Sequence, residues 1–286
     1  MNKVLVAGAS GALGRELVRL LHERDIAHCA QIRNPQKRHL LTDYCRDIRM
    51  ADVTRKDTVR GVCEGVHTVI NTIGKSVSLF TNDPNSFYDI DYYGNLNLLR
   101  EAKRAGVKRF IYISILGSET SPHLNQGWAQ ELFSRELMAS GLEYMIVKPT
   151  GLFSGLHDLL IMGYKGIVPT IGDGKAVTNP IHQHDLALTV LEHLQEGPHV
   201  LEAGGPDVHS RREVSEWVTE ITKGKDVKVP AWLARKGSHL WRPVKKELYD
   251  KFRFFAYITT HDMVAPKYGS EKLRPYLQRV YDQMTS

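Results

Sequence analysis

The sequence predicts an α/β protein, a doubly wound parallel sheet with a small, mostly helical C-terminal lobe over the substrate. Two observations predict this fold class. Strand-like and helix-like segments alternate through roughly the first 150 residues, the order expected of parallel strands joined by helical crossovers. After Pro149 the alternation loosens, and most of the helical patterns that follow fall outside the sheet.

Gly, Asn, Asp or Pro stands at nearly every joint between the apolar runs expected as strands and the helical patterns. The apolar runs are residues 3–8, 27–33, 46–53, 67–74, 109–114, 143–149 and 199–205. Helical spacing of apolar residues predicts helices at 14–24, 87–106, 180–195, 210–223 and 245–258. We expect residues 1–155, with 178–204 returning to them, to form the core, and residues 156–177 and 205–286 to form the smaller lobe.

Composition excludes several classes of protein. The longest apolar runs are strand-sized, well short of the roughly 20 residues that a membrane helix needs, and the first residues resemble no secretory signal. Cys29, Cys45 and Cys63 lack metal-ligand spacing, so free thiols in a reducing cytoplasm are expected. From residue 223 onward the chain has 14 Lys and Arg against 6 Asp and Glu, which suits a solvated helical face, an acidic partner, an anionic ligand or a membrane surface.

A glycine-rich turn, "GASGALG", stands between the first strand and the first helix. Gly8 permits a tight turn, Gly11 lets the backbone approach a pyrophosphate, and Gly14 allows close packing of helix on strand. The phosphates would meet the helix N-terminus, where free N–H groups favour an anion. We expect this Rossmann-like turn to bind a dinucleotide through Gly8, Ser10, Gly11, Ala12, Leu13 and Gly14.

The end of the second strand favours NADP(H) over NAD(H). An acidic residue there commonly holds the ribose 2′-hydroxyl of NAD, whereas a basic residue suits the 2′-phosphate of NADP. This chain offers "IRNPQKR", with Arg33 at the expected position and no acid in the stretch.

Beyond the glycines, "ADV" at 51–53, "NTIG" at 71–74, "DYYGNLNLLREAKRAGVKRFIYIS" and "NPIHQHDLA" appear in order. Together these motifs resemble the atypical and extended short-chain dehydrogenase/reductases, and most closely the NmrA-like branch related to complex I accessory subunits. The resemblance covers residues 1–222. It implies an NAD(P)-binding protein, either an oxidoreductase or a redox-sensing regulator.

The resemblance also implies roles for particular residues. Ser114, which ends the fifth strand, matches the active-site serine of the family. The positions that match cofactor contacts near the adenosine and the nicotinamide are Asp52, Val53, Thr72, Ile73, Gly74 and Pro149. Asp52 has a structural alternative, as the cap of a helix.

The usual proton donor of this superfamily is absent. A Tyr placed four residues before a Lys on one helix normally serves as the acid, with the Lys lowering the Tyr pKa. Counting back from "MASGLEYMIVKP", these positions fall at Gln126 and Gln130, and neither glutamine can do that work. The region between Ser114 and Met145 has one Tyr, Tyr144, and no Lys, so no shift of register restores the pair.

Other side chains are weaker candidates for acid–base chemistry. Packing is the alternative for each of them: Lys75, Tyr92, Tyr93, His123, Trp128 and His182. Asp185 is expected as a helix N-cap, and His182 with His184 lacks a third ligand for a metal site.

Two functions from different classes therefore remain. The first is an NADPH-dependent oxidoreductase for a small organic substrate, with Ser114 orienting that substrate. The second is a non-catalytic sensor, regulator or assembly factor that holds NADP(H) and docks a protein partner through its basic C-terminal region. Nucleic-acid binding is not expected, because the aromatic residues of that region recur at helical spacing.

Overall fold

The computed structural model describes residues 2–233 and 246–286, and the chain divides into two compact units. Unit 1 comprises Met1–Lys75, Pro84–Lys148 and Leu186–Leu201. Unit 2 comprises Ser76–Asp83, Pro149–Asp185 and Glu202–Ser286. The chain thus enters unit 2 once for a short segment before it returns to it after the sixth strand.

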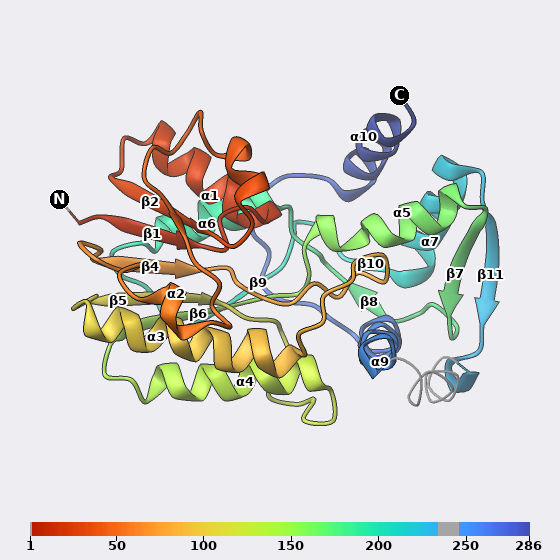
Figure 1. Ribbon diagram of the computed structural model, residues 1–286. Coiled ribbons are helices and arrows are strands. Elements are labelled where there is room, and N and C mark those ends of the chain that lie inside the picture. The colour runs from red at the N-terminus through yellow and green to blue at the C-terminus, as the bar shows by residue number, and fades with distance from the viewer. Residues whose placement is uncertain (1, 234–245) are drawn as a thin grey trace. The chain divides into compact units, whose positions relative to one another are not determined.

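The secondary structure alternates as the sequence predicts (Figure 1). The strands are β1 (Val4–Ala7), β2 (His28–Ile32), β3 (Ile48–Met50), β4 (Thr68–Asn71), β5 (Arg109–Ile113), β6 (Glu143–Pro149), β7 (Ile167–Ile171), β8 (Val177–Thr178), β9 (Val200–Ala203), β10 (His209–Ser210) and β11 (Lys225–Val229). The α-helices are α1 (Ala12–Glu23), α2 (Lys56–Val59), α3 (Asn95–Arg104), α4 (Asn125–Met138), α5 (His157–Tyr164), α6 (Gln183–Glu192), α7 (Arg211–Thr222), α9 (Lys246–Thr260) and α10 (Leu273–Thr285). Shorter helical segments are η1 (Pro35–Leu40), η2 (Tyr88–Gly94) and η3 (Phe153–Leu156).

The main sheet has seven strands in the order β3-β2-β1-β4-β5-β6-β9. β1 pairs in parallel with β2 on one side and β4 on the other, and the pairs β2–β3, β4–β5 and β5–β6 are parallel too. The chain therefore winds outward from β1 in both directions, and the order reverses between β1 and β4, where such sheets bind their ligands. The predicted Rossmann-like doubly wound sheet is confirmed.

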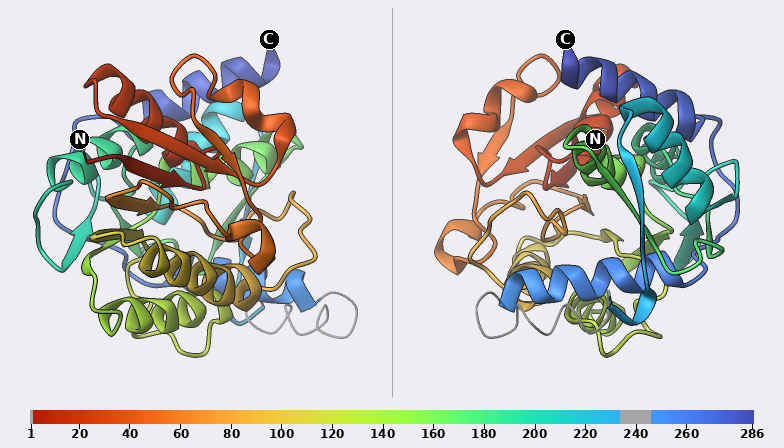
Figure 2. Two further views of the ribbon diagram at one scale, coloured as in Figure 1. Left: turned by 60° about the vertical axis from the view of Figure 1, so that its left-hand side comes forward. Right: turned by 90° about the vertical axis from the view of Figure 1, so that its right-hand side faces the viewer.

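Helices cover both faces of this sheet. α3 and α4 run side by side along one face, while α1 lies on the other (Figures 1 and 2). The core under α2, α3 and α4 includes fully buried residues from both the helices and the strands: Leu5, Val69, Leu98, Phe110, Tyr112, Phe133 and Leu137. These apolar side chains exclude water from the sheet, so a polar group buried among them must find its partners there.

The long helix predicted for residues 87–106 has two parts. η2 is a π-helical turn, and α3 continues directly from it until Ala105. Gly106 then ends the helix in the left-handed region, with φ +77°, as its position in the sequence indicates. A π-helical turn is rare and occurs frequently at functional sites, because its extra residue reorients the side chains around it.

Unit 2 contains several elements that the sequence pattern did not predict. The Gly-rich stretch after Pro149 forms α5 and β7, and β7 pairs in parallel with β11. α5, α7 and α10 pack together beside these strands around Leu160, Val218 and Leu277. Among the described residues, no helix is both long enough and apolar enough to cross a membrane.

Candidate dinucleotide and reaction site

The glycine-rich turn has the geometry that its sequence predicts. Gly8 follows β1 in the left-handed region, with φ +78°, and its N–H donates to Gln31 Oε1 at 3.0 Å. A Cβ on Gly8 would lie 2.7 Å from Thr72 Oγ1, so the residue must lack a side chain. The turn is thus held against the ends of β2 and β4, on the two sides of β1.

The start of α1 is open to an anion. Gly11 is the N-cap residue and supplies no side-chain acceptor to the first N–H groups of the helix. A Cβ on Gly14 would lie 2.5 Å from the Gly8 carbonyl oxygen and 2.7 Å from Ala9 Cα. Helix and turn therefore approach as closely as a pyrophosphate cradle requires, and this arrangement fits a dinucleotide.

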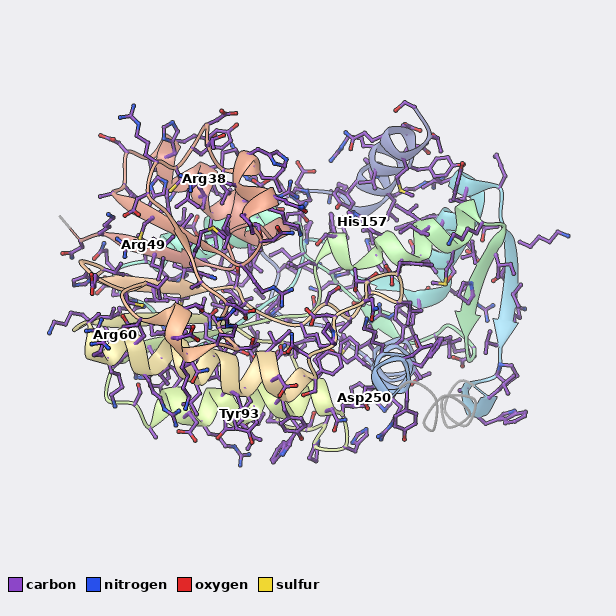
Figure 3. All side chains as sticks on the ribbon, in the orientation of Figure 1. Arg38, Arg49, Arg60, Tyr93, His157 and Asp250 are labelled. Carbon is purple, nitrogen blue, oxygen red and sulfur yellow. The ribbon has the colours of Figure 1, made fainter. Side chains whose placement is uncertain are left out.

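Arg33 and Asp52, which are both expected near the adenosine, differ in their surroundings. Arg33 follows β2 directly and is exposed, and Arg38 is exposed on η1 (Figure 3). Asp52 Oδ1 accepts hydrogen bonds from the N–H and the hydroxyl of Thr54, at 3.0 and 2.8 Å. The Asp52 carboxylate therefore organises its own turn rather than capping a helix, and Val53 beside it is buried.

The turn after β4 is fixed by its own polar groups. Thr72 Oγ1 donates to the carbonyl oxygen of Ala7 at 2.9 Å, and the Ile73 N–H donates to Asn71 Oδ1 at 3.0 Å. Gly74 passes so close to Asp91 that a Cβ would lie 3.2 Å from Asp91 Oδ1. The "NTIG" motif thus joins the glycine-rich turn on one side and a buried carboxyl group on the other.

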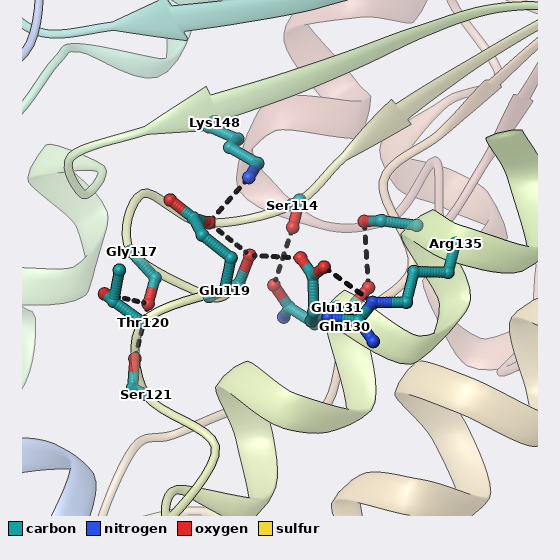
Figure 4. Close-up of polar contacts among 11 residues, drawn as sticks. Ser114, Gly117, Glu119, Thr120, Ser121, Gln130, Glu131, Arg135 and Lys148 are labelled. Carbon is teal, nitrogen blue, oxygen red and sulfur yellow. Dashed lines mark hydrogen bonds and ion pairs between the residues drawn. The ribbon is translucent and has the colours of Figure 1, made fainter.

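Ser114 lies where the sequence predicts, directly after β5, and it is buried. Its N–H donates to the Val147 carbonyl oxygen at 2.8 Å, and its hydroxyl oxygen lies 3.5 Å from Gln130 Oε1, the outer limit of hydrogen bonding (Figure 4). Gln126 and Gln130 are both buried on α4. Within the described part of the chain, Gln126 Oε1 has no hydrogen-bond donor. A buried acceptor of this kind fits a ligand that brings an N–H or O–H group.

Asp91 is the residue that sequence reasoning missed. It lies on η2, is fully buried, accepts a hydrogen bond from Gln130 Nε2 at 3.0 Å and another from the Lys75 N–H at 3.1 Å. Burial raises the pKa of Asp91 to about 7, although these hydrogen bonds and the Lys75 charge oppose the shift. The one signal in the sequence is a pair of acids, Asp89 and Asp91, inside the apolar and aromatic run "YDIDYYG".

A second polar chain runs beside Ser114. Lys148 near the end of β6 donates to Glu119 Oε2 at 2.6 Å, and the Ser118 hydroxyl bridges Glu119 and Glu131 (Figure 4). Burial alone would raise the pKa of Glu119, but the hydrogen bonds from Lys148, Ser118 and the backbone, together with the Lys148 charge, leave this pKa below its ordinary value. Lys148 is thus a paired cation held by an acid.

Two tyrosines on η2 lie away from this network. Tyr92 donates to Glu136 at 3.1 Å, and Tyr93 is exposed (Figure 3). Both line a surface pocket that contains none of the residues around Ser114: Thr54, Lys56, Asn85, Asp89, Tyr92, Tyr93, Leu96, Asn97, Arg100 and Glu136. The polar network around Ser114, rather than this pocket, is the candidate reaction site.

Unit 2 contains the remaining residues of interest. Pro149 ends β6 and is followed by Thr150, whose hydroxyl donates to the Asn179 carbonyl oxygen at 2.6 Å. Asp185 was expected as an N-cap, but it lies inside the first turn of α6. Its Oδ2 accepts the N–H groups of Ser270 and Glu271, both at 3.0 Å, so it anchors a distant segment instead.

The family is established by comparison with known proteins. The NAD(P)H-binding family matches residues 8–197, more than half of the chain. The protein belongs to this family. The predicted NmrA-like, atypical short-chain dehydrogenase/reductase membership of this NAD(P)H-binding protein is thereby confirmed.

Relatives of this NAD(P)H-binding protein have different names. A photosystem II assembly factor, Ycf39 of Cyanophora paradoxa, is 31% identical over 153 residues, which cover 54% of this chain and 46% of the relative. Sterol demethylase protein B of Methylococcus capsulatus is 29% identical over 177 residues, 62% of this chain and 52% of the relative. The chain thus spans about half the length of the curated relatives it matches.

Solved structures show the same fold. An NADPH-dependent quinone oxidoreductase from Escherichia coli, solved with NADPH, is similar with a TM-score of 0.71 and 17% identity. The similarity covers 99% of this chain and 100% of that one. At this identity it supports the fold and leaves the reaction to be argued from the site.

Proposed function

We propose that the protein is an NADP(H)-dependent oxidoreductase that reduces a conjugated carbonyl acceptor of the quinone type. The observation that carries the proposal is the polar network around Ser114, with glutamines at the two positions where a Tyr and a Lys normally stand. Ser114 would provide a polar contact for a small ligand at the carboxyl end of β5. The glycine-rich turn and Arg33 would hold the nucleotide, with Arg33 binding the 2′-phosphate of NADP(H).

The missing proton donor favours a particular class of acceptor. When bound, the reduced cofactor supplies a hydride. Reduction of a simple ketone produces an alkoxide, whose conjugate acid is about as weak as water, with a pKa of about 16. Reduction of a quinone produces a phenolate, whose conjugate acid has a pKa of about 10. This much weaker base can form without a dedicated acid and be protonated afterwards by the solvent. Glutamines at 126 and 130 are therefore compatible with quinones and not with simple ketones.

The reaction is tested with a panel of acceptors. Purified protein with NADPH should reduce duroquinone and menadione, and it should leave cyclohexanone and benzaldehyde unchanged. Ser114→Ala should lower kcat/KM for duroquinone about tenfold, the effect of one lost hydrogen bond to the ligand, while NADPH affinity stays within twofold. Turnover of the ketone at the same rate as the quinone, or no turnover of any acceptor, contradicts the proposal.

A second function is favoured by the relatives whose names describe assembly factors. In this case NADP(H) would stabilise a surface for a protein partner and would never be turned over. The basic residues from 223 onward would then contact an acidic partner.

The two functions differ in what the nucleotide controls. An assembly factor should retain a partner on an affinity column when NADPH is present, and release it when the nucleotide is removed, with no NADPH oxidation on the acceptor panel. The oxidoreductase should consume NADPH with a quinone in the absence of any other protein.

A further inference from the structure

Gln130 connects Asp91 to Ser114 through the two ends of one amide group. Its Nε2 donates to Asp91 Oδ1 at 3.0 Å, and its Oε1 lies 3.5 Å from the Ser114 hydroxyl oxygen. An amide has a donor at one end and an acceptor at the other, so the two hydrogen bonds are linked. If the Gln130 amide group rotated by 180°, both hydrogen bonds would reverse their direction together.

We propose that Asp91 is a positioning residue that sets, through Gln130, whether the Ser114 hydroxyl donates or accepts a hydrogen bond toward the ligand. Ser114 would thereby distinguish a carbonyl acceptor from its reduced, hydroxyl form. The proposal rests on the proposed reduction at Ser114, and it assigns to that site a means of selecting between substrate and product.

The chemistry of the carboxyl group decides the direction. An ionised Asp91 can only accept hydrogen bonds, so it selects the present orientation of Gln130. In this orientation Gln130 Oε1 accepts the hydrogen bond from the Ser114 hydroxyl. The lone pairs of Ser114 then face the ligand and suit an O–H group. A neutral Asp91 can donate to Gln130 Oε1, which turns Nε2 toward Ser114 and frees the Ser114 proton for a carbonyl oxygen.

The surroundings of Asp91 permit both states. Four residues from different elements contact Asp91 or act on its charge: Lys75 after β4, Tyr112 on β5, Gln130 on α4, and Asn95 on α3, which donates to the Asp91 backbone carbonyl oxygen. Lys75 is the charged one among them. Burial, followed by the nearby Asp91 charge, holds the pKa of the Tyr112 phenol well above its ordinary value, so Tyr112 stays neutral. With a pKa of about 7, Asp91 itself changes charge near neutral pH.

Binding and protonation are therefore coupled. A carbonyl ligand prefers the state with a neutral Asp91, so its binding should raise the fraction of protein that has taken up a proton. A hydroxyl ligand should do the opposite. A merely structural Asp91 would change the affinity for both ligands by the same factor.

The first measurement needs no ligand. The protein is labelled with ¹⁵N at glutamine and ¹³C at aspartate. The Asp91 carboxyl carbon and the Gln130 amide are then followed by NMR through the pH range around the Asp91 pKa of about 7. We expect nuclear Overhauser contacts from the Nε2 protons to move from Asp91 at high pH to Ser114 at low pH. Contacts that stay the same on both sides of the midpoint overturn the proposal.

The second measurement compares two probes, duroquinone and durohydroquinone, under anaerobic conditions. We expect the ratio of their dissociation constants to change about tenfold across the Asp91 midpoint, toward the quinone at low pH. In Asp91→Asn the side-chain oxygen keeps the bond from the Lys75 N–H, and its NH₂ donates to Gln130 Oε1. The ratio in this variant should be independent of pH and equal to the low-pH value of the wild type.

Glu101→Gln is the matched control, since Glu101 is a buried acid on α3 that pairs with Arg104 and the Gly61 N–H instead. It should keep the pH dependence of the wild type. A wild-type ratio that does not change with pH, or changes equally in Asp91→Asn, overturns the inference. If the Gln130 amide reverses but neither probe binds at any pH, the inference about Gln130 stands and the quinone-type function is wrong.

Discussion

At the scale of single residues, Gln130 connects the groups of the candidate site, because one end of its amide contacts Asp91 and the other lies near the Ser114 hydroxyl. The family resemblance implies that Gln126 and Gln130 occupy the positions where a Tyr and a Lys normally stand. The connection of Gln130 to Asp91 could not be predicted, because 39 residues separate Asp91 from Gln130 and no local pattern links them. Pairwise contacts between distant side chains depend on the tertiary fold, which a linear pattern does not contain.

Gly14 gives a direct test of the phosphate-binding role predicted for the glycine-rich turn. Gly14→Ala would place a Cβ 2.5 Å from the Gly8 carbonyl oxygen, so α1 must move away from the turn. We expect a loss of about 1–3 kcal/mol in the free energy of unfolding, with at least tenfold weaker NADPH binding. Urea unfolding and fluorescence titration measure the two effects. Gly155→Ala, where a Cβ meets nothing within 4 Å, should leave both unchanged.

Arg33 decides the predicted preference for NADP(H). Arg33→Asp should weaken NADPH binding at least tenfold and strengthen NADH binding, because an acid repels the 2′-phosphate and accepts from the 2′-hydroxyl. Both affinities are measured by fluorescence titration. Arg24→Asp makes the same change of charge at an exposed position after α1 and should alter neither affinity. Unchanged affinities in Arg33→Asp would refute the predicted role.

At the scale of elements, regular periodicity was predictable and irregular local structure was not. The strands of the main sheet follow from their apolar runs, and the end of α3 follows from Gly106. β7 was missed because its stretch is rich in glycine and its partner β11 lies more than 50 residues further on. The π-helical turn η2 was read as ordinary helix, since both helices share nearly the same apolar spacing.

The segment Ser76–Asp83 is held by buried charges of unit 2. Lys251 on α9 donates to the carbonyl oxygens of Ser78 and Thr81, at 2.8 and 2.7 Å, and Asp158 on α5 accepts from the hydroxyl of Ser78 and the N–H of Leu79, both at 2.7 Å. These are charge-assisted hydrogen bonds, which contribute more than neutral ones.

Removing the lysine should loosen this segment selectively. Lys251→Met keeps the buried stem and removes both donors, so amide hydrogen exchange in residues 76–83 should accelerate at least tenfold. Exchange in β1 and β4 should stay as in the wild type. Arg253→Met, two residues along α9, serves as the control and should leave the segment unchanged. Equal exchange in Lys251→Met and the wild type would show that the lysine does not hold the segment.

At the scale of the whole molecule, the order of the elements determined the main sheet. Parallel strands require long crossover connections, and the alternation of apolar runs with helical patterns leaves few other arrangements for such a chain. The division into units was harder to predict from the sequence, because Ser76–Asp83 belongs to unit 2 although it follows the turn after β4. Local sequence does not reveal which part of the protein a connecting segment packs against.

Asp91 should also affect how the free energy of unfolding of the entire protein depends on pH. Its folded-state pKa is about 7, above the ordinary value of 3.8, so between these values the folded protein holds a proton that the unfolded chain has released. The stability from this group is fully present below pH 3.8 and is lost as the pH rises through about 7, by up to roughly 1.4 kcal/mol per pH unit. Asp91→Asn has no proton to lose, so the free energy of unfolding of the wild type should fall relative to that of the variant across this interval. Urea unfolding of both proteins at a series of pH values measures the difference.

Because Asp47 has its pKa lowered to about 2 by Arg49 and Lys3, its contribution changes in a lower pH range and is common to both proteins. A constant difference between wild type and variant would mean that Asp91 is ionised throughout, and the buried carboxyl group would then have to be balanced by the Lys75 charge.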